Sequence, residues 1–248
     1  MSCKITMEKL LAIDVGNTNV KYGLFLNGEL SQTWKHPTSD TAAKCAEFLA
    51  KTDAPCALAC VSPEAGKLIK AALGSRLLLE VTAASQTVLA DMADGMGADR
   101  VADAVAAFLL YGNGSAVISM SFGTASTLLA MDAGGKVLGG WISSGLAAQL
   151  EVMHERCALL PLLSMSKPDT ALGVDTETHM SNGVLLGNIG AAREWIQTAT
   201  RQLGVEKAVS VATGGWAQVL QDKGRVFDHY DSALTLKGIY EIASRKKA

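Results

Sequence analysis

The sequence predicts an α/β fold made of two similar halves, residues 1–112 and 113–248. Short apolar runs of strand length alternate with longer segments whose apolar residues recur at helical spacing. Each half begins with an apolar run that ends in a glycine-rich turn. The order of strand, glycine turn, strand, tight turn and strand then occurs in both halves, which indicates an internal duplication.

The composition is that of a globular protein with a substantial core. The chain has 248 residues, enough for two compact domains, and 49% are hydrophobic against 19% charged. A net charge of −2 and a pI of about 6.1 are unlike the basic footprint of nucleic-acid-binding proteins. We therefore expect no nucleic-acid partner.

No apolar run reaches the ~18 residues of a membrane span. Lys4, Glu8 and Lys9 interrupt the start of the chain, where a signal peptide would be apolar. We expect a cytoplasmic protein with no membrane partner. The cysteines are odd in number and match no zinc or redox spacing, so all are expected to be reduced and structural. They are Cys3, Cys45, Cys56, Cys60 and Cys157.

The first half is predicted to hold strands followed by helices. Asn27-Gly28, between two strand-like runs, is a strong signal for a β-hairpin. Gly97 precedes the last helix of this half. The predicted strands are 10–14, 20–26, 29–34, 57–61 and 77–81, and the predicted helices are 41–51, 64–73 and 99–111.

The second half repeats this start and continues with longer helices. Gly134-Gly135 stands in the place of the hairpin turn, and Thr213-Gly214-Gly215 ends a strand and starts another helix. The predicted strands are 116–120, 127–131, 136–141 and 208–212, and the predicted helices are 146–159, 182–203 and 234–245.

The two starts align without a gap. A distance of 107 positions separates Gly16 from Gly123 and also separates Gly28 from Gly135. One offset for both turns favours duplication over a chance match.

The first glycine turn, Asp14-Val-Gly-Asn-Thr18, has the residue types of a phosphate and magnesium site. Gly16 permits a positive φ and a close approach of the backbone to a ligand. Asn17, Thr18 and the amides of the turn can bind phosphate oxygens. Asp14 can hold Mg²⁺, which takes one or two carboxylates together with phosphate oxygens. When this motif is considered alone, an ordinary hairpin explains it equally well.

Two further segments strengthen the phosphate interpretation. Gly123 and Thr124 lie in a second hairpin of the same kind, and two such hairpins can hold one polyphosphate. Thr213-Gly214-Gly215 lies between a strand and a helix, where a flat backbone and a helix N-terminus favour a nucleotide. A plain strand-to-helix loop is the alternative for this third segment.

Paired phosphate hairpins with a late Thr-Gly-Gly resemble the superfamily of acetate and sugar kinases, Hsp70 and actin. Within it, the chain resembles the type III pantothenate kinases, also called the Bvg accessory factor family. Gly-Ala-Asp-Arg at the start of an alanine-rich helix is the most specific match. The matching segments run through nearly the whole chain: 13–25, 97–100, 106–107, 123–127, 139–140, 144–146, 156–161, Gly173 with 175–176, 181–183 with Gly187, 213–215 and 234–238.

The resemblance implies two ribonuclease-H-like (actin-like ATPase) domains with a nucleotide cleft between them. It also implies the activity: phosphorylation of pantothenate by ATP to give 4′-phosphopantothenate, the first step of coenzyme A biosynthesis. Mg²⁺ is the expected cofactor, and a homodimer is the expected assembly.

The resemblance also implies residue roles. Asp99 is expected to be the general base for the pantothenate hydroxyl, and Asp14 to bind Mg²⁺. Gly97, Arg100 and Thr176 are the expected substrate-binding residues. The expected nucleotide-binding residues are Asp14, Gly16, Asn17, Thr18, Lys21, Gly123, Thr124, Thr213, Gly214 and Gly215.

The chain departs from the family pattern at some of these places. Ser121 stands where the family has an acid that helps bind an activating monovalent cation, and a hydroxyl is a weaker, neutral ligand. Activation by K⁺ or NH₄⁺ is therefore expected to be weak or lost. Asp103 replaces a common Asn one helical turn from Asp99, and two like charges there are expected to raise the pKa of Asp99. The segment 83–96 lacks the usual Tyr.

These departures leave two other functions open. One is a catalytically impaired relative that acts as a regulatory or binding protein, although the presence of both Asp14 and Asp99 argues against it. The other is a kinase for another small hydroxyl substrate, which the segment 83–96 would select.

Overall fold

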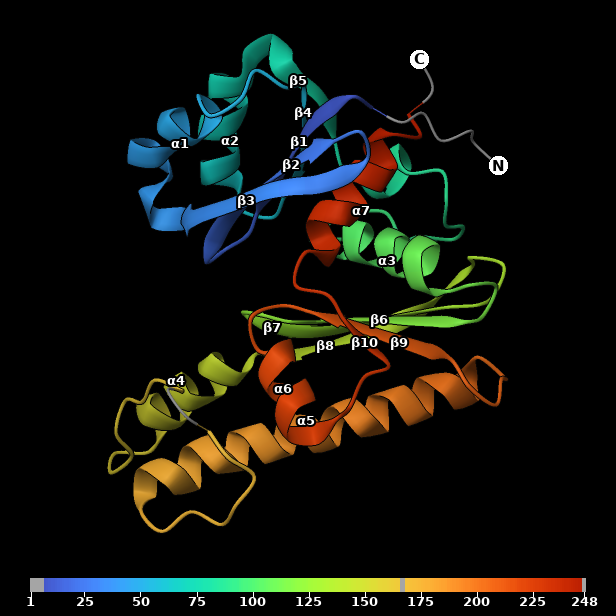
Figure 1. Ribbon diagram of the computed structural model, residues 1–248. Coiled ribbons are helices and arrows are strands. Elements are labelled where there is room, and N and C mark those ends of the chain that lie inside the picture. Colours follow the sequence, from blue (N-terminus) through green and yellow to red (C-terminus); the bar gives the residue numbers. More distant parts are fainter. Residues whose placement is uncertain (1–6, 166–167, 247–248) are drawn as a thin grey trace. The chain divides into compact units, whose positions relative to one another are not determined.

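The computed structural model describes residues 7–165 and 168–246, so Cys3 lies outside the described residues. The chain divides into two compact units (Figure 1). Its last helix belongs to the first unit, although the sequence places it in the second half. Unit 1 holds the described residues up to Leu110, Gly135–Val137 and the end from Ala233, and unit 2 holds Tyr111–Gly134 and Leu138–Ser232.

Unit 1 is built on a five-stranded sheet with the order β3-β2-β1-β4-β5. The pairs β1–β2 and β2–β3 are antiparallel, whereas β4 runs parallel to β1 and to β5. All five strands predicted for the first half are present, and the third extends further than predicted, to Pro37. The strands are β1 (Lys9–Val15), β2 (Asn19–Leu26), β3 (Glu29–Pro37), β4 (Cys56–Cys60) and β5 (Leu77–Glu80).

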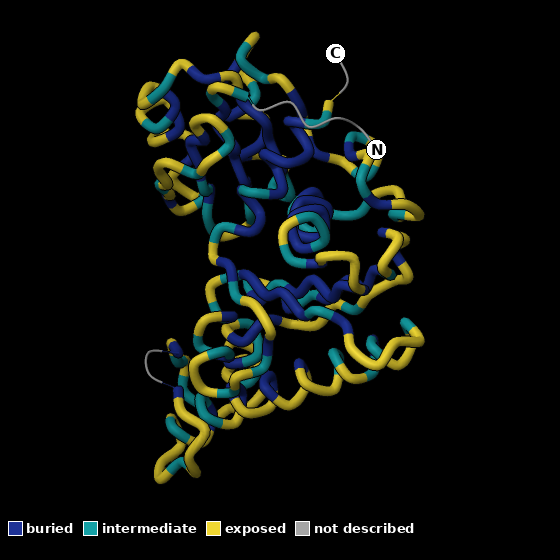
Figure 2. Tube along the Cα trace, turned by 45° about the vertical axis from the view of Figure 1, so that its right-hand side comes forward, coloured by how far each residue is buried: buried dark blue, intermediate teal, exposed yellow. Residues whose placement is uncertain are grey.

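Helices cover both faces of this sheet (Figure 1). On one face, α1 (Thr41–Leu49) and α2 (Pro63–Leu73) form a core with the side chain of Ile13. On the other face Phe25 stacks on Tyr240 of the last helix, α7 (Leu234–Ala243), with ring centroids 4.6 Å apart. Successive residues of a strand point to opposite faces, so Asp14 points to the α7 side. The central strands are buried (Figure 2).

The helix α3 (Ala98–Tyr111) packs against α7 (Leu234–Ala243) within unit 1. Gly238 of α7 lies so close to the backbone carbonyl of Ala102 that any side chain there would clash. The small residue lets the two helices approach closely, and this contact explains why the last helix belongs to unit 1.

Unit 2 is built on a second five-stranded sheet with the order β10-β9-β6-β7-β8. Its core lies between this sheet and three helices, of which α5 (Thr176–Gln202) is the longest (Figure 1). The strands are β6 (Val117–Phe122), β7 (Ala125–Met131), β8 (Val137–Ser144), β9 (Val209–Thr213) and β10 (His229–Tyr230), and the helices are α4 (Leu146–Arg156), α5 (Thr176–Gln202) and α6 (Ala217–Gly224).

The two sheets have the same connectivity. In each sheet the first three strands along the chain lie next to one another in sequence order. The fourth strand then pairs in parallel with the first, as β4 does with β1 and β9 with β6. The gapless alignment of the two starts is nevertheless wrong. Asp14 pairs with Lys21, whereas Ser121 pairs with Thr127, so the second hairpin is one residue shorter. Paired glycines at a constant offset do not fix the length of the turn between them.

Several elements of unit 2 differ from the sequence prediction, and among them α4 ends at Arg156 instead of 159 and β8 extends to Ser144 instead of 141. The helix α5 begins at Thr176 instead of about 182, because Asp175 caps it through the amide of Thr178. The strand β10, with only two residues, was not predicted. Within the described residues no helix is long and apolar enough to cross a membrane. The four described cysteines are free thiols: Cys45, Cys56, Cys60 and Cys157.

Candidate active site

Asp14 lies buried near the end of β1, beside the first glycine turn. Its cross-strand partner on β2 is Lys21, whose Nζ lies 3.5 Å from Oδ2 of Asp14. The Lys21 side chain is partly exposed, whereas the Asp14 side chain is not. The antiparallel register therefore places a buried carboxylate and a solvent-accessible ammonium group side by side at the end of the sheet.

Gly16 is needed for space and not for an unusual backbone conformation. Neither Gly16 nor Gly123 has a positive φ, so the prediction of a left-handed Gly16 is wrong. A Cβ at Gly16 would lie 3.0 Å from the carbonyl oxygen of Asn19, to which its own amide donates. Thr38 binds two other carbonyls of the turn, those of Gly16 at 2.8 Å and Thr18 at 2.9 Å. Two oxygens that would repel a phosphate are thus bound within the protein.

Three influences act on the pKa of Asp14. Burial raises this pKa, the ammonium group of Lys21 lowers it, and the carboxylate of Asp99 raises it. A bound cation would favour the charged form of the carboxylate for the same reason that Lys21 does. One carboxylate beside phosphate oxygens and water is a usual set of Mg²⁺ ligands. The residues present therefore fit Mg²⁺.

Asp99 lies in the first turn of α3, where the helix dipole favours a carboxylate. Its Oδ1 accepts a 2.8 Å hydrogen bond from the amide of Arg100. Gly97 provides the space for this carboxylate, because a Cβ there would lie 2.7 Å from Oδ1 of Asp99. The start of α3 thus brings together Gly97, Asp99 and Arg100.

Asp103, one turn further along α3, is buried. Its Oδ1 accepts a 2.7 Å hydrogen bond from the hydroxyl of Thr235. Burial raises the pKa of Asp103 well above its usual value, and the carboxylates of Asp99 and Asp14 add to this effect. The repulsion predicted within α3 therefore acts on the carboxyl of Asp103. Unit 1 gathers three interacting carboxyl groups and Lys21 on the α7 side of its sheet.

The second glycine hairpin lies at the matching end of the unit 2 sheet. The amide of Gly123 donates to the carbonyl of Ala125 at 3.0 Å and closes the turn. The amide of Gly145 donates to the carbonyl of Thr124 at 3.1 Å, and a side chain at Gly145 would clash with this turn. The partly buried Ser121 lies one residue before the end of β6.

The Thr213–Gly215 segment adjoins this hairpin within unit 2. Thr213 is the register partner of Ser121 in the parallel pair of β9 and β6. Gly214 has a φ of +100° and lies against the backbone of Phe122 so closely that a side chain would clash. The amide of Trp216 donates to the carbonyl of Phe122 at 3.0 Å. The fold therefore joins the two glycine segments that the sequence predicts for nucleotide binding in this half.

Thr176 does not join the other predicted substrate-binding residues within one unit. It is the exposed first residue of α5 in unit 2, whereas Gly97 and Arg100 belong to unit 1. The nearby His179 lies on the same helix, and its Nε2 is 3.1 Å from the carbonyl oxygen of Gly173.

Sequence reasoning missed two residues that support the site. Thr38 holds the carbonyl groups of the first glycine turn, and Thr235 binds the buried Asp103. Thr235 lies inside the segment 234–238 that matched the family, which is the signal that could have identified it. Thr38 lies in no such segment, and no local pattern marks it.

Comparison with known proteins gives a consistent result. A family model described as type III pantothenate kinase matches residues 10–198. The type III pantothenate kinase of Agathobacter rectalis is 33% identical over 262 residues, which cover 96% of this chain and 98% of that protein. The match therefore includes both units.

Solved structures show a similar fold at low sequence identity. A crystal structure from Campylobacter jejuni, provisionally assigned to a Baf family of transcriptional activators, has a TM-score of 0.62 at 19% identity and covers 94% of this chain and 96% of its own. An archaeal actin homologue has a TM-score of 0.56 at 10% identity and covers 96% of this chain and 99% of its own. These likenesses concern the fold alone, which the chain shares with an archaeal actin homologue.

Proposed function

Because this chain belongs to the type III pantothenate kinase family, we propose that it phosphorylates pantothenate with ATP. The products are 4′-phosphopantothenate and ADP, and the reaction is the first step of coenzyme A biosynthesis. One observation supports this proposal most directly. Asp14 and Asp99 lie in the same unit, and Val61 links their surroundings: its amide donates to the carbonyl of Val15 at 3.0 Å, and a Cβ at Gly97 would lie 3.5 Å from its side chain. A carboxylate for the metal and a carboxylate for the proton are thus near each other.

Asp99 acts as the general base in this proposal. The hydroxyl oxygen of pantothenate attacks the γ-phosphorus, its proton moves to Asp99, and the bond from the γ-phosphorus to the bridging oxygen breaks to release ADP. Oδ1 of Asp99 is held by the amide of Arg100, so we assign the proton to Oδ2. The guanidinium group of Arg100, the next residue of α3, is assigned to the binding of pantothenate.

Asp14 and Lys21 hold the phosphate end of the reaction. Mg²⁺, when bound, would neutralise charge on the phosphate oxygens, and Asp14 is the residue that would hold it. The Nζ of Lys21, 3.5 Å from Asp14, is positioned to bind a phosphate oxygen as well. Gly16, Asn17 and Thr18 supply the turn that faces the phosphates.

Unit 2 contributes its own glycine segments to nucleotide binding in this proposal. Gly123 and Thr124 are assigned to phosphate oxygens, because they form the tip of the second hairpin. Thr213, Gly214 and Gly215 are assigned to the nucleoside. Their attachment to the backbone of Phe122 supports one joint role for both segments.

Ser121 gives this chain a weak site for a monovalent cation. Its neighbours in the sheet, Thr127 and Thr213, are also uncharged. Hydroxyl oxygens without a carboxylate bind K⁺ or NH₄⁺ weakly, so we propose that neither ion activates the reaction strongly.

We also propose that the protein is a cytoplasmic homodimer. Unit 2 exposes several large apolar side chains, including Ile142 of β8, which is 61% exposed, and Leu186 of α5, which is 52% exposed. The remaining apolar face of α5 is buried in the core. The exposed apolar side chains support a contact with a second copy, which the mass of the protein in solution will test.

Product analysis tests the proposed reaction. Purified protein is incubated with Mg-ATP, with and without pantothenate, and ADP and the phosphorus NMR spectrum are followed. We expect ADP release that depends on pantothenate, together with a new phosphomonoester resonance. ATP binding without pantothenate-dependent release would instead favour the regulatory function or another hydroxyl substrate. A panel of sugars and amino alcohols distinguishes those two outcomes.

A further inference from the structure

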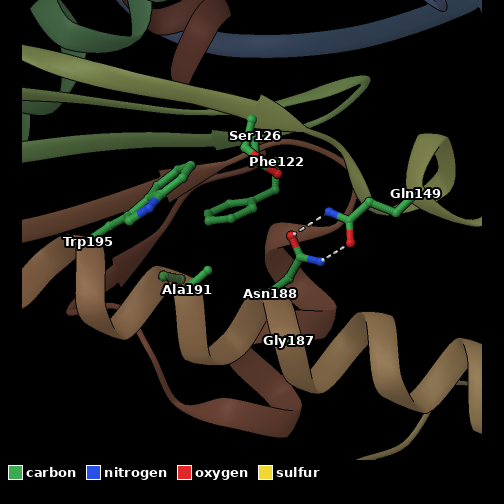
Figure 3. A pocket seen from close by; sticks show the side chains of 9 residues that line it. Phe122, Ser126, Gln149, Gly187, Asn188, Ala191 and Trp195 are labelled. Carbon is green, nitrogen blue, oxygen red and sulfur yellow. Dashed lines mark hydrogen bonds between the residues drawn. The ribbon is translucent and has the colours of Figure 1, made fainter. Parts of the chain in front are cut away.

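A pocket of about 270 Å³ lies within unit 2, between the long helix α5 and the strands β6 and β7 (Figure 3). None of the residues that line it belongs to the nucleotide or substrate sites proposed above. Among its described lining residues no side chain is charged. Its lining includes Phe122, Ser126, Gln149, Gly187, Asn188 and Trp195.

One wall of the pocket carries a buried hydroxyl group without a partner. Ser126 of β7 is 2% exposed, and its Oγ makes no hydrogen bond. Buried polar atoms are nearly always hydrogen-bonded in folded proteins, so each exception calls for an explanation. Ser126 lines the pocket, so a rotation of its side chain about χ1 would bring this hydroxyl group to a ligand, which would supply the missing partner.

The opposite wall carries two side-chain amides that face each other (Figure 3). Asn188 donates to Gln149 at 3.2 Å, and Gln149 donates to Asn188 at 3.4 Å. Both distances exceed the 2.9–3.0 Å that is most common for such bonds. Asn188 is anchored by a 2.8 Å bond to the carbonyl of Val184, and Gln149 by a 3.0 Å bond to that of Ser144. The pair therefore offers donors and acceptors in fixed positions, joined by bonds that a ligand can replace.

Phe122 connects this pocket to the glycine segments of unit 2. Its ring lines the pocket, and it pairs with Ser126 across the base of the second glycine hairpin. Its backbone carbonyl accepts the amide of Trp216, and Gly214 packs against its backbone. A molecule that contacts the Phe122 ring therefore touches the residue on which both glycine segments rest.

We propose that this pocket binds a small uncharged molecule that has an amide or hydroxyl group on an apolar body, and that its binding is transmitted through Phe122 to both glycine segments of unit 2. The polar group would bind Ser126, Gln149 and Asn188, and the apolar body would pack on Phe122 and Trp195. An ionised carboxylate or phosphate would lose its hydration without gaining a countercharge. ATP and pantothenate, which are both ionised, are thus excluded as ligands.

Benzamide is a suitable probe, because it joins a neutral amide to an apolar ring. Benzoate at pH 7.5 has the same shape with a negative charge. In a titration of ¹⁵N-labelled protein, benzamide is expected to shift the amide resonances of Gly187 and Asn188 to saturation. Benzoate is expected to bind at least about tenfold more weakly, which corresponds to ~1.4 kcal/mol. The amide resonances of Gly123 and Gly214 are expected to shift at the same benzamide concentration as those of Gly187 and Asn188.

Gly187→Leu tests the location of the binding site. No atom lies within 4 Å of a Cβ built at Gly187, so a side chain fits there and occupies the space of the ligand. Gly190 lies on the same helix with equally open surroundings, but it does not line the pocket. We expect Gly187→Leu to abolish the benzamide shifts and Gly190→Leu to leave them unchanged. Both variants gain helix propensity, which guards against loss of the fold.

Three results would overturn the binding proposal: no saturable shift with benzamide, equal affinity for benzoate, or undiminished binding to Gly187→Leu. Saturable binding with unchanged Gly123 and Gly214 resonances would overturn the transmission through Phe122. The titration contains no ATP, so its result does not depend on whether the protein has the proposed kinase activity. A protein that phosphorylates pantothenate but does not bind benzamide disproves only the pocket proposal.

Discussion

The hydroxyl group of Thr235 on α7 donates a 2.7 Å hydrogen bond to Oδ1 of Asp103 on α3, although 132 positions separate the two residues. Both side chains are buried. This bond joins the end of the chain to the helix that carries Asp99, the proposed base. It also opposes the rise in the pKa of Asp103 that burial and the nearby carboxylates cause.

Asp103→Asn is expected to change how stability depends on pH. The pKa of Asp103 is raised in the folded protein above its usual value of 3.8, so the folded state holds this proton more tightly than the unfolded chain. The contribution of Asp103 to stability is therefore full below about pH 4 and is lost as the pH rises through the folded-state pKa. Asparagine stays neutral and still accepts the bond from Thr235. At neutral pH we expect the variant to be more stable than the wild type, by ~1.4 kcal/mol for each unit of pKa difference.

Urea unfolding at a series of pH values measures this effect. The difference between variant and wild type should widen as the pH rises from about 4. Asp94→Asn is the control, because Asp94 is an exposed carboxyl in the same unit. A difference that stays constant across this range would contradict the assignment of a buried, proton-holding carboxyl to Asp103.

Thr235→Val is expected to destabilise the protein by about 1–3 kcal/mol, because it leaves the buried Asp103 without its hydrogen-bond donor. Thr235→Ser keeps the hydroxyl group and is expected to lose much less. Chemical unfolding of both variants gives the comparison. Equal losses for valine and serine would show that packing, not the hydrogen bond, is the important contribution of Thr235.

Gly97→Ala is expected to lower kcat with little change in ATP affinity. The new Cβ would lie 2.7 Å from the present position of Oδ1 of Asp99, so the carboxylate must move. A displacement of about 1 Å at a catalytic group can cost ~100-fold in rate. Gly183→Ala is the matched control, because a Cβ at Gly183 meets no atom within 4 Å. Unchanged turnover in Gly97→Ala would remove the steric role proposed for Gly97.

Ser121→Asp is expected to introduce activation by K⁺ or NH₄⁺. The wild-type rate should be similar in sodium and potassium salts, because Ser121 offers a neutral ligand. The variant should be faster in potassium, since a carboxylate attracts the cation. The measurement is the steady-state rate of the wild type and of Ser121→Asp in sodium and potassium salts at equal concentration. If potassium already accelerates the wild-type protein, another group supplies the cation ligand.

The sequence was sufficient for features that neighbouring residues encode. The apolar run of β1, the turn at Gly28 and the start of α3 after Gly97 were predicted close to their observed places. Each depends on the spacing of apolar residues or on the conformational freedom of glycine. The two-sheet α/β architecture followed from their order and is confirmed.

Features that depend on contacts between distant segments were not predictable in this way. No local pattern states that Thr235 binds Asp103, or that Thr38 binds the first glycine turn. The one-residue difference between the hairpins appeared only in the pairing registers. The early start of α5 did have a local signal, the capping pair Asp175 and Thr178, but its first turns lack apolar periodicity.

The role of Asp99 is the central claim, and pantothenate-dependent ADP release by Asp99→Asn tests it most directly. Asparagine keeps the shape of the side chain and its bond from the Arg100 amide, but it cannot accept the substrate proton. We expect turnover to fall by about 10²–10⁴-fold while the affinity for ATP stays within about twofold of the wild type. Near-normal turnover in this variant, measured beside an active wild-type protein, would contradict the account.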